Sequence, residues 1–365
     1  MMIYLVKSNN KLINNNIINV TADPKANGGV SSAVKSLIAS NIYGNKTSFI
    51  HPHSEGNLLL KIFVLIKALC LFTLKCIFLR PEFVHIHTSS YNSFKRKYNF
   101  IKICQLLKIK YLVHIHGGGF VSFYNEESKM WQRNIVTALK GAKTVISISP
   151  ASRKELEQCF TINNCRVIPN FVTGLPNIKV SLEDVIKKKK NLSILFLGDI
   201  SDNKGFEDAV KVISEVRKNY PYIVLNCAGK QDINYFNSVI NKYHAKGFIN
   251  YHGFVKSHKK IQLMVKALFI LSPSKIETFG MSNLESALMG TPALAYAVGG
   301  VPFVINSGKS GYLATLGDWP SLVEPILKYI ASDNDYLILQ QTCIKDMQSK
   351  FSIDSISNKY QKLYQ

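Results

Sequence analysis

Acidic side chains are scarce in this sequence of 365 residues, because 23 Asp and Glu stand against 45 Lys and Arg and leave a formal net charge of +22. Such a surface attracts polyanions, but charge alone does not distinguish nucleic acid, anionic lipid and phosphorylated substrates. Paired cysteines are also lacking, since the seven cysteines are scattered and include no Cys-x-x-Cys pair. The sequence therefore argues against a disulfide framework and a zinc ribbon, and it favours a reducing cytoplasm.

Two common kinds of nucleotide-binding motif are absent as well. The chain contains no Gly-x-Gly-x-x-Gly and no Walker loop, which argues against dinucleotide dehydrogenases and P-loop kinases. It also contains no recognised nucleic-acid module and no basic helix with interleaved aromatic residues. A non-catalytic protein that binds polyanions is therefore an alternative that rests on net charge alone.

Long apolar runs are rare. No basic region precedes the short apolar run at residues 3–6, so we expect a first β-strand there and not a signal peptide. Residues 58–79 are long and apolar enough to span a bilayer. Lys61, Lys67 and Lys75 interrupt this segment, and a Lys near the middle of a spanning helix costs about 2.5–3.5 kcal/mol. Because Lys61 and Lys75 share a helical face, we expect an amphipathic helix packed on a sheet, ahead of a membrane-surface helix and of a spanning helix.

Apolar runs rich in β-branched and aromatic residues alternate with longer helical patterns, as in parallel βαβ units. The length and the 47% hydrophobic composition fit two folded domains. The predicted strands are 3–6, 47–51, 83–87, 111–116, 144–149 and 166–168 in the first half, and 193–198, 222–228, 248–251, 267–272 and 293–297 in the second. We predict an α/β protein with domains at 1–175 and 192–350, a linker at 176–191, where a Pro and four consecutive lysines break the pattern, and a terminal helix at 351–365.

Glycines and histidines mark the expected ligand edge of the first domain. In a parallel sheet, ligands bind beyond the carboxyl ends of the strands, where helix N-termini point at the site. Gly28 and Gly29 precede a predicted helix and allow backbone amides to approach a phosphate or a sugar hydroxyl; a plain turn fits them equally. His114 and His116 end an apolar strand on the same side, before three glycines. His116 is either an imidazole that faces a sugar or a buried histidine bonded to the backbone.

The second half carries the stronger candidate site. Gly198 ends a predicted strand, and Lys204 precedes a glycine at a helix start, where an ammonium group can neutralise a diphosphate. Glu277 and Glu285 flank the Gly280 turn that begins another helix. The helix N-terminus can bind an anion, Glu285 can hydrogen-bond a ribose diol, and Glu277 can reach the sugar. Two glutamates at this spacing can also be ordinary ion-pairing residues.

These motifs, in this order, resemble family 4 of the retaining glycosyltransferases over nearly the whole chain. The residues that carry the resemblance are Asn27-Gly28-Gly29, His116-Gly117, Ile148-Ser149, Pro169-Asn170, Gly198, Lys204-Gly205, Gly253-Phe254-Val255, Glu277, Phe279-Gly280, Glu285, Gly290-Thr291-Pro292, Gly299-Gly300-Val301-Pro302 and Ser310-Gly311-Tyr312-Leu313. The resemblance implies a GT-B fold: two Rossmann-like domains that face a cleft, with the terminal helix returning to the first. The N-terminal domain would bind the acceptor and the C-terminal domain would bind most of the donor, with no requirement for a metal.

Carried over residue by residue, the resemblance gives roles to individual side chains. Lys204 would hold the donor diphosphate, Glu285 the ribose and Glu277 the transferred sugar, and the expected catalytic set is His116, Lys204 and Glu277. The expected donor-binding residues are Gly28, Gly29, Gly198, Lys204, Gly253, Phe254, Val255, Glu277, Phe279, Gly280, Met281, Ser282 and Glu285. Two positions depart from the family pattern, because Asp199 stands in place of a usual Arg and Phe303 in place of a usual Glu. The first departure leaves the diphosphate one cation short.

The resemblance implies retaining transfer of a hexosyl unit from a nucleotide sugar, UDP-linked in preference to GDP-linked, to a lipid-linked or polysaccharide acceptor in cell-surface glycan synthesis. It implies no bound cofactor and no nucleic-acid partner. A sugar-nucleotide epimerase of similar fold is the alternative enzyme. The first half also carries Lys95-Arg96-Lys97, Lys102, Lys108 and Lys110, so we expect a cytoplasmic protein that binds the anionic inner face of the cell membrane peripherally.

Overall fold

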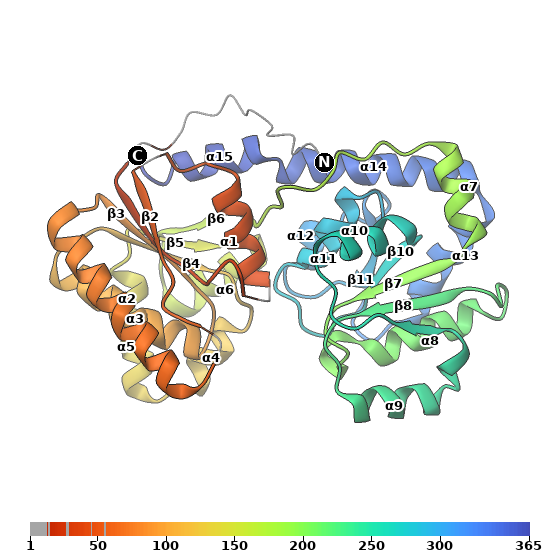
Figure 1. Ribbon diagram of the computed structural model, residues 1–365, viewed down its shortest axis with the longest axis horizontal. Helices are drawn as coiled ribbons and strands as arrows, with labels where there is room; N and C mark the ends of the chain where they lie inside the picture. Colours follow the sequence, from red (N-terminus) through yellow and green to blue (C-terminus); the bar gives the residue numbers. More distant parts are fainter. Residues whose placement is uncertain (1–12, 14, 27–28, 45, 55) are drawn as a thin grey trace. The chain divides into compact units, whose positions relative to one another are not determined.

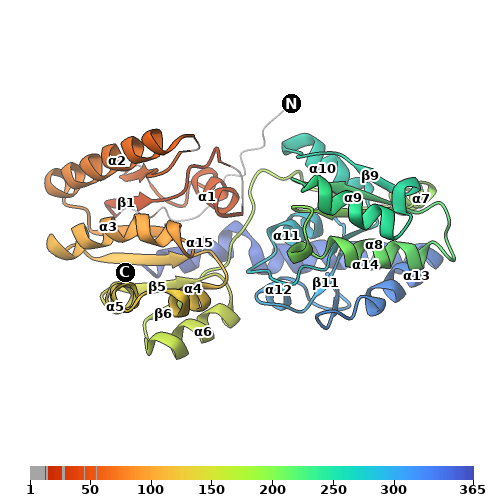
Figure 2. The ribbon, with the colours of Figure 1, turned by 90° about the horizontal axis from the view of Figure 1, so that it is seen from below.

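The computed structural model of the protein describes residue 13 and residues 15–26, 29–44, 46–54 and 56–365. It divides into two compact units, the first comprising Met1–Gly174 with Phe351–Gln365 and the second Leu175–Lys350. Each unit is built on one parallel sheet of six described strands with helices on both faces (Figures 1 and 2). The prediction of an α/β protein with two parallel-sheet domains is confirmed.

The first sheet has the strand order β2-β1-β3-β4-β5-β6. Its strands are β1 (Ile17–Val20), β2 (Thr47–Ile50), β3 (Phe83–Thr88), β4 (Tyr111–Ile115), β5 (Thr144–Ser147) and β6 (Cys165–Val167). The helices of this unit are α1 (Gly29–Ala39), α2 (Leu58–Leu79), α3 (Asn92–Leu106), α4 (Phe120–Glu126), α5 (Lys129–Lys140), α6 (Pro150–Phe160) and α15 (Ile353–Gln361). Since α2, α3 and α5 cover one face and α1 and α15 the other, the central strands are buried on both sides.

One strand of the first sheet was not predicted. β1 lies inside the sheet between β2 and β3, but its four residues follow asparagines at 14–16, and such a cluster is typical of a loop. The strand expected at residues 3–6 lies outside the described residues. The other five predicted strands of this half are present, each within two residues of its predicted ends.

The second sheet has the order β12-β11-β10-β7-β8-β9. Its strands are β7 (Ser193–Leu197), β8 (Val224–Ala228), β9 (Ile249–Tyr251), β10 (Phe269–Ser272), β11 (Ala293–Tyr296) and β12 (Gly311–Ala314). The helices are α7 (Leu182–Lys190), η1 (Asp202–Lys204), α8 (Phe206–Val216), α9 (Ile233–Lys242), η2 (Ala245–Gly247), α10 (Ser257–Lys266), α11 (Met281–Leu288), α12 (Val301–Val304), η3 (Pro320–Leu322), α13 (Val323–Ala331) and α14 (Asp333–Phe351). β12 was not predicted as a strand.

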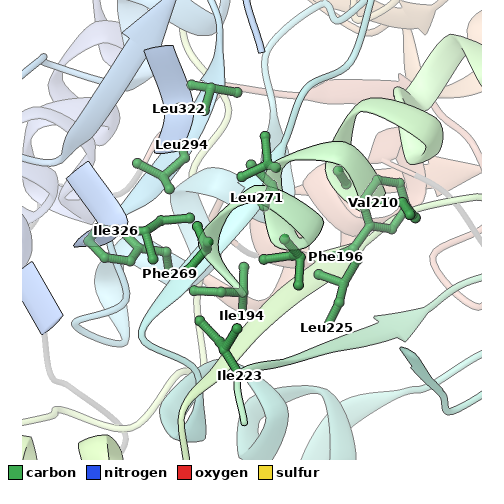
Figure 3. Close-up of a cluster of buried hydrophobic side chains, with 14 of the residues drawn as sticks. Ile194, Phe196, Val210, Ile223, Leu225, Phe269, Leu271, Leu294, Leu322 and Ile326 are labelled. Atoms are coloured by element: carbon green, nitrogen blue, oxygen red, sulfur yellow. The ribbon is translucent and has the colours of Figure 1, made fainter. Parts of the chain in front are cut away.

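The core of the second unit lies between its sheet and helices α8 and α13. Figure 3 shows Phe196 of β7 and Leu271 of β10 among the side chains that meet Val210 of α8 and Ile326 of α13. Each of these side chains is at most 2% exposed, and burying one large apolar side chain contributes about 1.5–3 kcal/mol. This packing fixes the strands whose carboxyl ends carry the candidate site.

The linker expected at 176–191 is partly wrong, because half of it is helix α7. Ser181 and Asp184 form a reciprocal capping box at the helix start, and Val185 is fully buried in the second unit. The four consecutive lysines occupy the last turn, where cations interact favourably with the helix dipole. Lys189 also pairs with Asp333, with 2.6 Å between the ammonium nitrogen and the carboxylate oxygen. The lysine run therefore ends a packed helix.

The last helix, α15, belongs to the first unit although it follows the whole second unit in sequence. Ile356, Tyr360 and Tyr364 are buried in the core on the α1 side of the first sheet. The hydroxyl of Tyr364 lies 2.6 Å from Nδ1 of His85 on β3. The return of the terminal helix to the first domain, which the family resemblance implied, is present in the structure.

Helix α2 packs on the first unit through a narrow stripe, in which Ala68, Phe72 and Cys76 are buried. The ring of Phe72 meets that of Phe100 on α3 at a centroid distance of 5.0 Å. The expected helix packed on a sheet is therefore present. This helix is also the one described helix long and apolar enough to cross a membrane, and 17% of its most apolar window is buried.

The outward stripe of α2 is apolar and does not contain the three lysines. Lys61 precedes Ala68 by seven residues and Phe72 by eleven, so it lies on the packed side of the helix. The outward stripe at spacings of three and four residues is apolar and exposed: Leu59 77%, Phe63 63%, Ile66 55%, Leu74 52% and Ile77 49%. Such a contiguous apolar face is unusual on a soluble monomer and marks an interaction surface.

Candidate functional site

The candidate donor site lies at the carboxyl edge of the second sheet. Gly198 directly follows β7, Lys204 lies in η1, and Glu277 lies between β10 and α11. Together with Ser282 on the first turn of α11, these residues line one small cavity. The structure therefore brings together four of the residues that the sequence assigned to the donor.

An ion pair joins two of the three expected catalytic residues. The ammonium nitrogen of Lys204 lies 2.7 Å from Oε2 of Glu277. The other oxygen of Glu277, Oε1, accepts hydrogen bonds from the backbone amides of Thr278 at 3.0 Å and Gly280 at 3.3 Å. The Lys204 and Glu277 side chains are 35% and 18% exposed, so both charges remain accessible to a ligand. A bound diphosphate would draw Lys204 away from this carboxylate.

Glycines hold the Glu277 loop against its neighbours. A Cβ added to Gly299 would lie 2.0 Å from the carbonyl oxygen of Glu277, and one added to Gly300 would lie 2.0 Å from that of Thr278. Gly205, at φ +72°, meets the carbonyl of Pro273 in the same way, with an added Cβ at 1.9 Å. These backbone-to-backbone contacts explain the glycines of the sequence motifs, because no other residue fits them.

The second glutamate has a partner that the sequence analysis missed. Both carboxylate oxygens of Glu285 accept hydrogen bonds from the Lys260 ammonium of α10, at 2.8 and 2.7 Å. The Glu285 side chain is 9% exposed and that of Lys260 24%. No sequence signal pointed to Lys260, because it lies 25 residues from Glu285 in a different helix. A ribose diol that approaches Glu285 therefore meets a charge-neutral pair.

The segment expected beside the base follows β9. Gly253 adopts φ +69° and accepts a hydrogen bond from the Gly229 amide at 3.0 Å. Val255 is buried, whereas the Phe254 ring is 47% exposed and carries the Lys256 ammonium 5.5 Å from its centroid. An exposed aromatic face at the edge of a parallel sheet is a suitable platform for a planar base.

Both departures from the family pattern are visible in the structure. Asp199 is exposed after β7. Phe303 packs edge-on against Phe279, with 6.4 Å between the ring centroids, and so extends the apolar support under the Glu277 turn. Lys260 supplies a cation at α11 that the sequence analysis did not count.

In the first unit, Gly29 begins α1, and Gly28 lies outside the described residues. The prediction that His114 and His116 share one side of their strand is confirmed, because their rings stack at 4.0 Å. His116 is 7% exposed; its Nδ1 lies 3.1 Å from Oδ1 of Asn170 and its Nε2 2.9 Å from Nδ1 of His87. Burial lowers the pKa of His116 to about 4, so the ring is neutral at physiological pH.

Comparison with known proteins supports the same assignment for both units. The family model described as Glycosyltransferase Family 4 matches residues 42–173, and that described as Glycosyl transferases group 1 matches residues 178–346. Two parallel-sheet units of this kind form the GT-B fold, and both family models describe glycosyltransferases. The chain belongs to glycosyltransferase family 4. Membership of this family favours a glycosyltransferase over the epimerase and over the non-catalytic polyanion binder.

Individual relatives are distant but extend over much of the chain. An uncharacterized 41.2 kDa protein in the cps region of Klebsiella pneumoniae is 24% identical over 378 residues, which cover 96% of this chain and 99% of the relative. O-antigen chain mannosyltransferase B of Escherichia coli is 22% identical over 214 residues, or 56% of this chain and 55% of the relative. Among solved structures, Anabaena Alr3699/HepE in complex with UDP has a TM-score of 0.74 at 17% identity and covers 95% of this chain and 98% of its own. That structural likeness concerns the fold.

Proposed function

We propose that this glycosyltransferase transfers a hexosyl unit, with retention of configuration, from a UDP-sugar to a lipid-linked or polysaccharide acceptor in cell-surface glycan synthesis. The observation that carries the proposal is the pair of Lys–Glu contacts around α11, Lys204 with Glu277 and Lys260 with Glu285. Their two cations and two hydrogen-bonding carboxylates match the phosphates, ribose and sugar of a nucleoside diphosphate sugar. No bound cofactor takes part in the proposal.

The chemistry follows from the charge that develops on the leaving group. As the bond from the sugar to the phosphate breaks, negative charge builds on the diphosphate, and the Lys204 ammonium and the N-terminus of α11 stabilise it. Glu277 leaves its ion pair and accepts hydrogen bonds from the sugar hydroxyls. The acceptor hydroxyl attacks from the face that the nucleotide leaves and gives its proton to the departing phosphate, so no protein base is required.

The choice of donor and acceptor rests on the relatives. Anabaena HepE was solved with UDP, and relatives of this chain include a protein of a cps region and an O-antigen chain mannosyltransferase. We therefore expect a uridine nucleotide and an acceptor that belongs to a surface polysaccharide or its lipid-linked precursor.

A lipid-linked acceptor would lie at the membrane, and α2 has the surface to meet it. Its outward stripe, formed by Leu59, Phe63, Ile66, Leu74 and Ile77, is apolar and exposed. At the C-terminal end of the helix, Arg80, Lys108 and Lys110 line one hollow of about 630 Å³. Apolar side chains that enter the acyl boundary beside cations that meet anionic headgroups are the features of an interfacial helix. We propose that α2 lies in the inner leaflet surface.

The basic cluster expected to hold the membrane is only partly available. Lys97 is 5% exposed and hydrogen-bonds Ser93 at 3.1 Å. Lys95 lies 2.5 Å from Glu127 and over the ring of Trp131. Neither ammonium is presented to a membrane. Lys108 and Lys110, which are exposed near the C-terminal end of α2, are better candidates for contact with anionic headgroups.

The donor and the stereochemistry are tested together. Purified enzyme is incubated with UDP- and GDP-hexoses and polyprenyl-diphosphate-linked saccharides, and the anomeric configuration of the product is read by NMR. We expect turnover with one UDP-sugar and a product anomer equal to that of the donor. Donor isomerisation without acceptor would indicate an epimerase, and an inverted product would refute retention.

The membrane proposal is tested by vesicle co-sedimentation. The variant Phe63→Ser/Ile66→Ser/Leu74→Ser should bind anionic vesicles at least about tenfold more weakly than the wild type, because each buried apolar side chain contributes about 1.5–3 kcal/mol. The control changes three equally exposed apolar residues of the second unit, Ile233, Leu316 and Ile338, to Ser. Equal binding by both variants would refute docking through α2.

A further inference from the structure

Four histidines form a buried ladder on the α15 side of the first sheet. His85 and His87 alternate along β3, His114 lies on β4 and His116 directly follows it, and His87 is paired with His114 in register. Neighbouring rings stack with centroid distances of 4.1 Å on β3 and 4.0 Å on β4. All four side chains are at most 7% exposed. Burying four imidazoles away from water lowers the stability of the fold unless their ring nitrogens have hydrogen-bond or metal partners.

Several of these nitrogens have no protein partner among the described residues. Nε2 of His85 and both ring nitrogens of His114 are buried without a hydrogen bond, as is the side-chain nitrogen of Asn19 on the adjacent strand. Nearly every buried polar atom in native proteins is satisfied by protein, water or an ion. An occupant that accepts three imidazole lone pairs at once would account for the ladder.

The geometry points to a transition-metal site. We propose that His85, His87 and His114 bind one divalent transition-metal ion such as zinc in the core of the first unit. Their ligand atoms all lie within 4.8 Å of one another. Tetrahedral zinc with ligand nitrogens at about 2.0–2.1 Å sets those nitrogens about 3.4 Å apart, so the rings need to close by only about 1.4 Å. Two histidines at alternate positions of one strand and a third on the neighbouring strand can converge in this way.

The surrounding hydrogen bonds orient the rings for this role. Nδ1 of His85 lies 2.6 Å from the hydroxyl of Tyr364 and 3.1 Å from that of Tyr43, which leaves Nε2 to face the cluster. Metal-bound histidines usually hold their second nitrogen in such a bond. His87 has its Nδ1 against His116 and only a long 3.4 Å contact from Nε2 to Asn19. His116 is not a proposed ligand, because both its nitrogens are already bonded to His87 and Asn170.

None of the three proposed ligands is among the predicted donor-binding or catalytic residues, although His87 contacts His116, and the transfer chemistry proposed above does not use this ion. Its consequence is structural. Tyr364 follows α15, and its hydroxyl bonds the ring of His85, so the ion would tie the terminal segment to strands β3 and β4. Metal bound only to the folded chain stabilises that chain by mass action.

The test uses the full chain, purified without a polyhistidine tag. Metal content is measured by elemental analysis after growth with zinc, and the metal-free protein is titrated with zinc and with cobalt(II), whose visible absorption reports the coordination number. We expect about one zinc per chain, a melting temperature raised by added zinc, and cobalt bands of four-coordinate geometry, with the three histidines and one water as ligands. A wild-type chain that retains no zinc, with an unchanged melting temperature in the titration, would overturn the proposal.

Variants locate the ion. His114→Gln and His85→Gln should each lose most of the bound zinc and the zinc-dependent rise in melting temperature. His252→Gln is the matched control, since His252 is a half-buried histidine of the second unit bonded to Asn226 at 2.9 Å, and it should keep both. Zinc retained at wild-type level in His114→Gln would place the ion elsewhere and refute the assignment. If the variants do not fold, the wild-type titration and the cobalt spectrum still decide the question.

Discussion

Exchanging Glu277 for glutamine should strengthen the binding of UDP, although Glu277 belongs to the proposed donor site. In the free enzyme the Lys204 ammonium lies 2.7 Å from the Glu277 carboxylate, and a diphosphate must compete for that cation. Because the Lys204 side chain is 35% exposed, the pair is worth at most about 0.5–1 kcal/mol after solvent screening. Glu277→Gln keeps the oxygen that accepts from the Thr278 and Gly280 amides. We expect UDP to bind about two- to fivefold more tightly.

Lys204→Met should act in the opposite direction. It removes a charge-assisted contact with the diphosphate, worth about 1.5–3 kcal/mol, so the affinity for UDP should fall about ten- to hundredfold. Calorimetric titration of the wild type, both single variants and the double variant measures these effects and their coupling. Lys275→Met is the control, because Lys275 pairs with Asp202 in the same region and both side chains are well exposed.

Turnover separates the two roles of Glu277. Glu277→Gln should lower kcat while UDP affinity rises, since the carboxylate would contact the transferred sugar and not the nucleotide. An equal loss of UDP affinity in Glu277→Gln and Lys204→Met would refute the reasoning. The carboxylate would then shape the loop and would not compete for Lys204.

Three further predictions concern stability. Lys260→Met should lower the free energy of unfolding by about 1–3 kcal/mol, because it leaves the Glu285 carboxylate without its cation; adding Glu285→Gln should restore most of the loss in chemical denaturation. Gly205→Ala should cost at least about 2 kcal/mol through its positive φ and its contact with the Pro273 carbonyl, whereas Gly247→Ala, with open space around it, should change the midpoint little. Burial lowers the pKa of Lys97 to about 7 from 10.5, so the unfolded chain binds more protons between these values and wild-type stability rises with pH there. Lys97→Met should therefore stabilise the protein most below pH 7, by on the order of 2 kcal/mol more at pH 6 than at pH 9, and an advantage independent of pH would contradict this.

Local sequence patterns were enough to predict most of the strands and the turn at Glu277. Strands such as β4 and β10 are short apolar runs bounded by glycine or polar residues. This pattern can be recognised without any knowledge of tertiary contacts. The Glu277 turn was predictable for a similar reason, because Gly299 and Gly300 are required by close backbone contacts and Gly280 by its φ of +83°. The sequence analysis was right where the conformation of a segment depends on its own residues.

The errors arise where partners lie far apart in sequence. β1 is a strand because β2 and β3 flank it on both sides, although Asn19 and the asparagines before it suggest a loop. Lys260 reaches Glu285 only through the packing of α10 against α11. The apolar outward stripe of α2 was not predicted, because the side chains of α3 decide which stripe is buried. Tertiary packing overrides local preference in each case.

The position of α15 also has a consequence for the order in which the protein can fold during synthesis. A ribosome adds about 5–20 residues per second, so the first sheet emerges well before Ile356, Tyr360 and Tyr364, which complete one of its two hydrophobic layers. Until the second unit has been translated, that layer and the histidines beneath it stay open to water. The nascent first unit therefore stays incomplete until α15 has been translated, and a ribosome that stalls within the second unit would expose an incomplete apolar surface to chaperones.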